Sequence, residues 1–274
     1  MFKGVLKEQA VQVGIGFVFI VVLLGTFVLP EWMSNNFMYG LSRGLAVLGL
    51  MILWRTNLVS FGHALFYGFG AYAVAIAQKY LGVTDIFLRV LVAILAAGIL
   101  GFILGFILRR YREIFFAMLS LAFSMVLYGL LAKAEFLGST DGMSISPSTI
   151  FGLELGRFGL FYFIGFVVII SLIFAHCYLR SSLGHLTTAI SDNEIRVEYL
   201  GYSVEKAIHI KYVISACLAG GAGGLMAASL GQVDPDSMVL WSVSGELVFV
   251  TIMAGLGNIL APFVGAIFFE FIRT

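Results

Sequence analysis

The chain has 274 residues, of which 61% are hydrophobic and only 11% are charged. A soluble globular domain usually carries about 25% charged residues, so this composition argues against a soluble protein and indicates a chain that crosses a bilayer many times. The net charge of +1 comes with no basic tract that would bind nucleic acid. The 32 glycines suit helix packing in lipid, where small residues let two backbones approach closely.

A helix needs about 20 apolar residues to cross a bilayer. The last apolar stretch, 244–272, is interrupted by Gly255–Asn258 and Pro262, and is either one tilted helix or two half-helices. The predicted fold is therefore all-α, a polytopic transmembrane helical bundle of about 8–9 spans with one or more broken or re-entrant helices. We expect one transmembrane domain over 1–274. The other predicted spans are 11–29, 38–54, 58–78, 86–108, 114–132, 158–179 and 207–230.

The positions of lysine and arginine between the apolar runs predict which ends face the cytoplasm. With the N-terminus inside, Lys3, Lys7, Lys206 and the basic cluster 109–112 all lie on the cytoplasmic side. The opposite orientation puts that cluster outside, so we expect a cytoplasmic N-terminus. The first run, 11–29, is longer than the apolar part of a typical signal peptide, and we expect it to be a retained span.

Two connecting segments are longer than the others, 133–157 on the predicted outer side and 180–206 on the inner side. Long connections in a compact protein are often functional. In the inner segment, Gly201 lies where a helix would end, since glycine takes the left-handed conformation readily. We therefore predict one or two short amphipathic helices on the cytoplasmic surface. Their apolar stripe at helical spacing is Leu186, Ile190, Val197 and Leu200.

A polar triplet, Asp192, Asn193 and Glu194, lies in the middle of this inner segment. Such a triplet is either a solvated turn that caps a helix or part of a surface that docks a partner. The adjoining apolar stripe has no obvious membrane face, and a groove on a partner protein would bury it. The residues alone leave both interpretations open.

The run that begins at Asn57 places polar groups and glycines inside a predicted span. Each interior glycine disfavours a helix by about 1 kcal/mol relative to alanine, so we expect a broken or re-entrant helix, lined by protein or by a water-filled cavity. One interpretation is the wall of a substrate path. The other is close helix packing, with Ser60 and His63 bonded to neighbouring helices. The candidate path residues are Asn57, Ser60, Gly62, His63, Phe66, Tyr67, Gly70 and Tyr72.

The sequence gives no sign of enzyme chemistry or of an ion-coupling site. It contains no Walker A loop, no Gly-x-Ser-x-Gly, no His-Glu-x-x-His and no Cys-x-x-Cys, so we expect neither a catalytic nor a metal site. Arg43, Glu246 and Glu270 lie near or within apolar runs, where a central charge costs roughly 2.5–3.5 kcal/mol. We expect Arg43 and Glu246 to reach the outer interface and Glu270 the inner one, rather than to form a proton relay.

Five motifs together resemble the LivM-type permeases, which are subunits of branched-chain amino acid ABC importers. Each motif is weak alone, but their order along about residues 40–270 is specific. The motifs are 58–64 with 70–73, 138–143, 180–201 with Lys211, 218–225 with Pro235, and Gly255–Asn258 with Pro262 and Gly265.

The resemblance implies a permease subunit that forms half of a translocation path for branched-chain or related amino acids. It implies a second permease subunit, two cytoplasmic ATPases that bind ATP and Mg, and a soluble periplasmic or lipid-anchored substrate-binding protein, in a bacterial or archaeal plasma membrane. This chain itself would need no cofactor, and its inner segment 180–206 would couple to the ATPases. The matching coupling positions are Gly184, Asp192, Asn193, Glu194 and Gly201.

The alternative is a stand-alone secondary transporter or channel for a small polar solute such as urea. Such a protein would need an intramembrane ion site, and we find no convincing one in the sequence.

Overall fold

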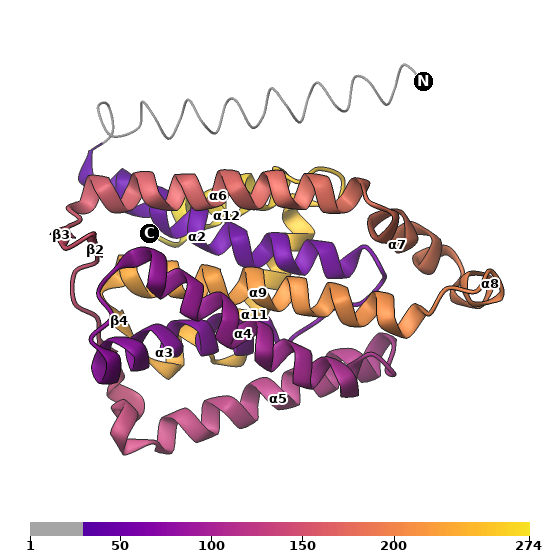
Figure 1. Ribbon diagram of the computed structural model, residues 1–274, viewed down its shortest axis with the longest axis horizontal. Helices are drawn as coiled ribbons and strands as arrows, with labels where there is room; N and C mark the ends of the chain where they lie inside the picture. Colours follow the sequence, from indigo (N-terminus) through magenta and orange to yellow (C-terminus); the bar gives the residue numbers. More distant parts are fainter. Residues whose placement is uncertain (1–29) are drawn as a thin grey trace.

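A computed structural model describes residues 30–274 of the chain (Figure 1). The predicted first span, 11–29, lies outside these residues. The described part is a bundle of long helices, which confirms the predicted all-α class. The long helices are α2 (Glu31–Trp54), α3 (His63–Leu81), α4 (Ile86–Leu108), α5 (Glu113–Lys133), α6 (Arg157–Arg180) and α9 (Val204–Leu230).

Within the described part, six helical stretches are long and apolar enough to cross a membrane. They are α2, α4, α5, α6, α9 and the stretch Pro235–Ala254, which joins α10 (Pro235–Met238) to α11 (Trp241–Ala254). The predicted run 86–108 coincides with α4. By contrast, α2 begins at Glu31, before the predicted run 38–54, because a helix continues where its sequence turns polar at the membrane surface.

The run 58–78 is interrupted at its start, up to Gly62, and not at the glycines further along. Residues 55–62 are not helical, and α3 is continuous from His63 to Leu81. A Cβ atom at Gly70 would lie 2.6 Å from the Cα atom of Gly220 in α9. This glycine therefore allows two backbones to pack directly against each other, and the expectation of a break is wrong for Gly70, whereas Gly62 does end the non-helical segment.

The last apolar stretch is two half-helices, α11 and α12 (Ala261–Arg273), which settles the alternatives left open by the sequence. The intervening segment 255–260 starts at Gly255, whose φ is 79°. α12 has only 13 residues, too few to cross a bilayer alone, since a span needs about 20. Both half-helices pack against α2 and against each other.

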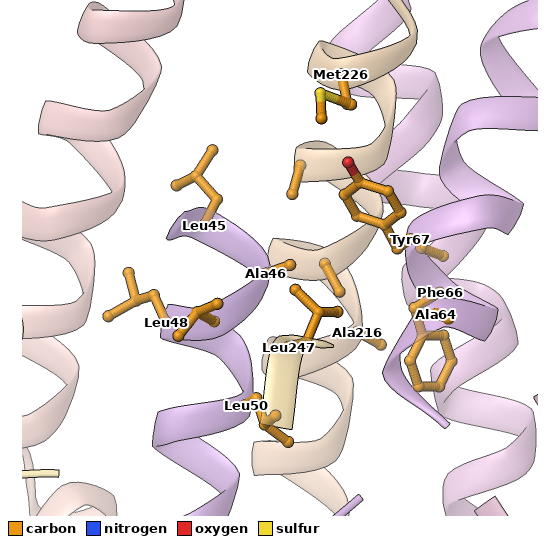
Figure 2. Packing of buried hydrophobic residues seen from close by; sticks show 14 of the residues in the cluster. Leu45, Ala46, Leu48, Leu50, Ala64, Phe66, Tyr67, Ala216, Met226 and Leu247 are labelled. Atoms are coloured by element: carbon orange, nitrogen blue, oxygen red, sulfur yellow. The ribbon is translucent and has the colours of Figure 1, made fainter. Parts of the chain in front are cut away.

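The core of the bundle surrounds α9, which packs against α2, α3 and α4. Figure 2 shows α9 between α2, which contributes Leu45 and Leu48, and α3, which contributes Phe66 and Tyr67. The most apolar window of α2 is 83% buried, whereas that of α5 is only 22% buried. α2 is therefore a core helix and α5 a peripheral one, with an apolar surface suited to lipid or to another protein.

One end of the bundle, here called the β-strand end, holds the predicted long connection 133–157. Arg89 of α4 fastens this connection: it is fully buried and donates to the Ser146 carbonyl and to the Ser148 hydroxyl, both at 2.9 Å. Short antiparallel strands complete this end. They are β1 (Met143–Ser144) with β4 (Gln232–Val233), and β2 (Thr149–Ile150) with β3 (Leu153–Glu154).

The opposite end carries two short helices, α7 (Ser182–Asp192) and α8 (Glu194–Tyr199), here called the coupling segment. Figure 1 shows α8 projecting beyond the long helices, far from the β-strand end. The prediction of one or two short helices in the inner segment is thus confirmed. The rest of this chain, and not a partner, buries Ile190 and Val197 of the apolar stripe, whereas Leu186 is half-buried and Leu200 is exposed.

Candidate functional site

The start of α3 is held by hydrogen bonds to helices that are distant in the sequence. His63 is fully buried, and its Nε2 atom lies 2.6 Å from the hydroxyl of Ser215 in α9. The amide of Ala64 donates to the hydroxyl of Ser244 in α11 at 3.0 Å. The first turn of α3 is therefore bonded to both α9 and α11, and any movement of this turn would displace or break those bonds.

The predicted path residues, apart from Asn57, are all buried in this conformation. Gly62 packs against α5, where an added Cβ atom would lie 2.6 Å from the carbonyl carbon of Ser120. The hydroxyls of Tyr67 and Tyr72 have no hydrogen-bond partner within 30–274. The residues thus pack between helices here. His63 bonds to a neighbouring helix, as the second interpretation expected, but that expectation is wrong for Ser60, which bonds within its own segment. The role of these residues in a substrate path stays a prediction. Ser60 accepts from the Gly62 amide, and Phe66 packs edge-on against His63.

Three charged residues of the apolar runs meet in one cluster. Arg43, near the middle of α2, lies 2.6 Å from Glu246 of α11 and 2.8 Å from Glu270 of α12. Arg273 also approaches Glu246, at 3.3 Å. The expectation that Glu270 reaches the inner interface is wrong, because α12 runs back along α2 and returns this carboxylate to the level of Arg43. The outward placement of Arg43 and Glu246 stays a prediction: Glu246 is 28% exposed, and its second partner Arg273 is 50% exposed.

The coupling segment is ordered by its own local contacts. Gly184 packs tightly on the end of α6, where a Cβ atom would overlap the carbonyl oxygens of Tyr178 and Leu179. Asn193 separates the two helices, and its side chain accepts from the Arg196 amide at 2.9 Å, so it caps α8. Gly201 follows α8 with a φ of 87°, as predicted for the end of a helix.

Two loops at the ends of other helices attach to the coupling segment. The Nε atom of Arg112, just before α5, lies 2.8 and 2.9 Å from the two carboxylate oxygens of Glu194. The side chain of Asn57, in the loop before α3, donates to the Ser191 carbonyl at 3.1 Å. Asn57 therefore lies at the coupling end, not beside His63. In the sequence, Arg112 is one member of the basic cluster 109–112, and nothing there indicates that it pairs with Glu194.

The same end has a small cleft and an exposed apolar surface. The cleft, of about 270 Å³, lies between the two loops and the coupling segment. Arg55 beside it donates to the Leu256 carbonyl at 2.8 Å, and burial lowers the pKa of its guanidinium. Four apolar or aromatic side chains around α8 are exposed, which is unusual for an element outside the bilayer-spanning bundle. They are Ile195, Tyr199, Leu200 and Tyr202.

A second, polar cavity of about 390 Å³ opens at the β-strand end. It lies between the ends of α2, α6 and α9 and the connection 143–155, and it includes Arg157, which is paired with Glu31 at 2.7 Å. No group of three or more His, Cys, Asp or Glu side chains within 30–274 could hold a metal ion.

Helices long enough to span a bilayer, a hairpin of half-helices and a structured segment at one end define a multi-pass helical membrane protein. The family comparison then defines the class of membrane protein more narrowly. The chain belongs to the family described as branched-chain amino acid transport system / permease component, whose model matches residues 32–274.

Individual relatives agree with the family. The chain is 32% identical over 250 residues to the high-affinity branched-chain amino acid transport system permease protein LivM of Escherichia coli, and 30% identical over 253 residues to its Salmonella typhimurium counterpart. These matches cover 81% of this chain and 58% of each relative, so the chain spans less than two thirds of their length. A probable permease LivH of Methanocaldococcus jannaschii is 26% identical over 238 residues, covering 81% of this chain and 72% of the relative. No solved structure gave a significant match.

Proposed function

We propose that this chain is the permease subunit of an ATP-binding-cassette importer for branched-chain or related amino acids. It forms half of the translocation path together with a second permease subunit. Two cytoplasmic ATPases, which bind ATP and Mg, supply the energy, and a soluble periplasmic or lipid-anchored protein delivers the substrate. The family match and the LivM relatives support the permease role.

The observation that carries the proposal is the exposed apolar surface of the coupling segment. Tyr199, the last residue of α8, is 88% exposed, and Leu200, which follows it, is 71% exposed, although the side chain of Asn193 caps this helix. Outside the bilayer, such a cluster is expected to be covered by a protein partner. A helix that presents apolar anchors fits a groove on another protein, and in an importer of this class that protein is an ATPase subunit.

The membrane is a bacterial or archaeal plasma membrane, and the N-terminus and the coupling segment lie on its cytoplasmic side. The basic cluster 109–112 supports this orientation, since it lies at the same end as the coupling segment. In each cycle the ATPase pair closes on ATP, and the coupling segment moves as a rigid body. The long helices then switch between outward-facing and inward-facing arrangements.

The proposal is tested by purifying the chain from its native membranes in mild detergent and identifying the co-purifying proteins. We expect one other permease and an ATPase with a Walker A motif in stoichiometric amounts. Proteoliposomes of the complex with its binding protein should accumulate radiolabelled leucine only when ATP is enclosed on the ATPase side. Purification of the chain alone, with leucine or urea flux that needs no ATP, would instead favour the transporter or channel alternative.

A further inference from the structure

The coupling segment is not attached to the bundle only through the helices that precede and follow it. Along the chain it lies between α6 and α9. In space it is also bonded to the loops that begin α3 and α5, which are separate from it by long stretches of sequence. A movement of the segment therefore has two further routes into the bundle.

We propose that Arg112 and Asn57 are positioning residues that transmit the movement of the coupling segment to α5 and α3. This inference rests on the proposed function, because it assumes that an ATPase moves the segment. Arg112 connects Glu194, the first residue of α8, to the start of α5. Asn57 connects Ser191, near the end of α7, to the loop that leads into α3.

The Arg112 contact is suited to transmit force in both directions. Its Nε atom faces both oxygens of Glu194, at 2.8 and 2.9 Å, and its Nη1 atom donates to the carbonyls of Arg109 and Tyr111. The guanidinium is thus fixed to its own loop as well as to α8. Both side chains are about one-third exposed or less, at 28% and 34%, so water only partly screens the pair.

The Asn57 contact leads directly to the polar contacts of the first turn of α3. Asn57 has a φ of 59°, a conformation that asparagine tolerates better than most residues, and this turns its side chain toward Ser191. Only residues 58–62 separate it from His63, which is bonded to Ser215 in α9. A displacement at Ser191 is therefore carried over a short, largely buried segment to the junction of α3, α9 and α11.

The test compares charge variants in the complete reconstituted complex, with leucine as the transported probe. Two quantities are measured: the ATPase retained on purification, and the leucine transported per ATP hydrolysed. We expect Arg112→Glu to retain the ATPase but to lower transport per ATP by about fivefold or more. The charge-swapped variant, Arg112→Glu with Glu194→Arg, should recover most of the ratio.

A matched control lies in the same loop. Arg110→Glu makes the same change of charge, yet the Arg110 side chain forms no ion pair or hydrogen bond to the coupling segment within 30–274, so it should leave the ratio unchanged. Asn57→Gly keeps the backbone conformation but removes the side-chain amide, and it should lower the leucine transported per ATP. Asn57→Asp should lower this ratio too, because the carboxylate has no N–H group to donate to the Ser191 carbonyl. If Arg112→Glu does not accumulate in the membrane, the neutral variants Arg112→Gln and Glu194→Gln replace it. Their effects on the leucine transported per ATP should not add in the double variant, because both remove the same ion pair.

The possible outcomes separate this inference from the proposed function. If the unmodified chain retains no ATPase and moves no leucine, the proposed function fails before any variant is compared. If the unmodified complex is active but Arg112→Glu and Asn57→Gly transport normally per ATP, the inference is wrong and the function stands. A lowered ratio that the charge swap does not restore would also overturn the role of the Arg112–Glu194 pair.

Discussion

The ion-pair cluster within the bundle permits a quantitative prediction. Arg43→Leu would remove the partner of Glu270, whose side chain is only 6% exposed. Removing one member of a buried ion pair costs about 3–5 kcal/mol, because the other charge is left uncompensated. Glu246 keeps Arg273 as a partner at 3.3 Å and is 28% exposed, so most of the loss should come from Glu270. We therefore expect Arg43→Leu to lower the free energy of unfolding by about 3–5 kcal/mol.

A second substitution distinguishes lost charge pairing from lost packing. In Arg43→Leu with Glu270→Leu, neither member of the pair remains, and replacing buried pairs by apolar residues is often neutral or stabilising by about 1–4 kcal/mol. The double variant should therefore be more stable than the single one. As a control, Arg157→Leu breaks an equally short pair with Glu31, but the two side chains are 48% and 82% exposed. That exposed pair should contribute at most about 1 kcal/mol.

The assay is unfolding by SDS in mixed micelles, followed by the fluorescence of the three tryptophans. The argument fails if Arg43→Leu and Arg157→Leu destabilise the protein equally. It also fails if the double variant is no more stable than Arg43→Leu, since the buried carboxylate would then not be the source of the cost.

Two further predictions concern packing and the β-strand end. Gly70→Leu should sharply reduce the yield of folded protein, because any side chain there overlaps the Gly220 backbone. Gly129→Leu on α5 should not, since a Cβ atom at Gly129 meets nothing within 4 Å. The yield is measured by size-exclusion chromatography, and a normal yield of both variants would refute the close packing at Gly70. Arg89→Met should make the 143–155 connection sensitive to protease, since its bonds to Ser146 are lost; unchanged cleavage would show that the strands alone hold it.

The sequence predicted those parts of the fold that depend on local physics. The length of α4 was predicted at both ends, because lipid demands an apolar run of fixed length and its flanking residues are polar. The end of α8 was predicted from Gly201, because glycine is a local conformational signal. Gly255–Asn258 marked a possible break before α12, but the sequence left one tilted helix and two half-helices open. Hydropathy gave no equivalent signal for the start of α2, where polar residues continue the helix beyond the apolar run.

What the sequence missed depends on which helices are neighbours. Arg43 and Glu270 lie at opposite ends of the chain, and only the return of α12 along α2 brings them to 2.8 Å. Ser215 and Ser244 carried no sign that they would bind the start of α3. Membrane helices have similar apolar compositions, so composition does not show which helices will be neighbours. The partner of a buried polar group depends on how the helices pack, which the sequence of one helix does not determine.

The Arg43 cluster and the contacts of the coupling segment divide the bundle into two parts that can move separately. The cluster of Arg43, Glu246 and Glu270 binds α11 and α12 to α2, and replacing such contacts inside a membrane is costly, so these three helices should move together. The coupling segment, by contrast, is bonded to the starts of α3 and α5. If the segment moves relative to the bundle, the junction that must yield is the first turn of α3, where His63 and Ala64 meet α9 and α11. Of the predicted path residues, Ser60, Gly62, His63 and Phe66 lie at or next to that junction, which gives a physical reason to look for a path there in a second conformation.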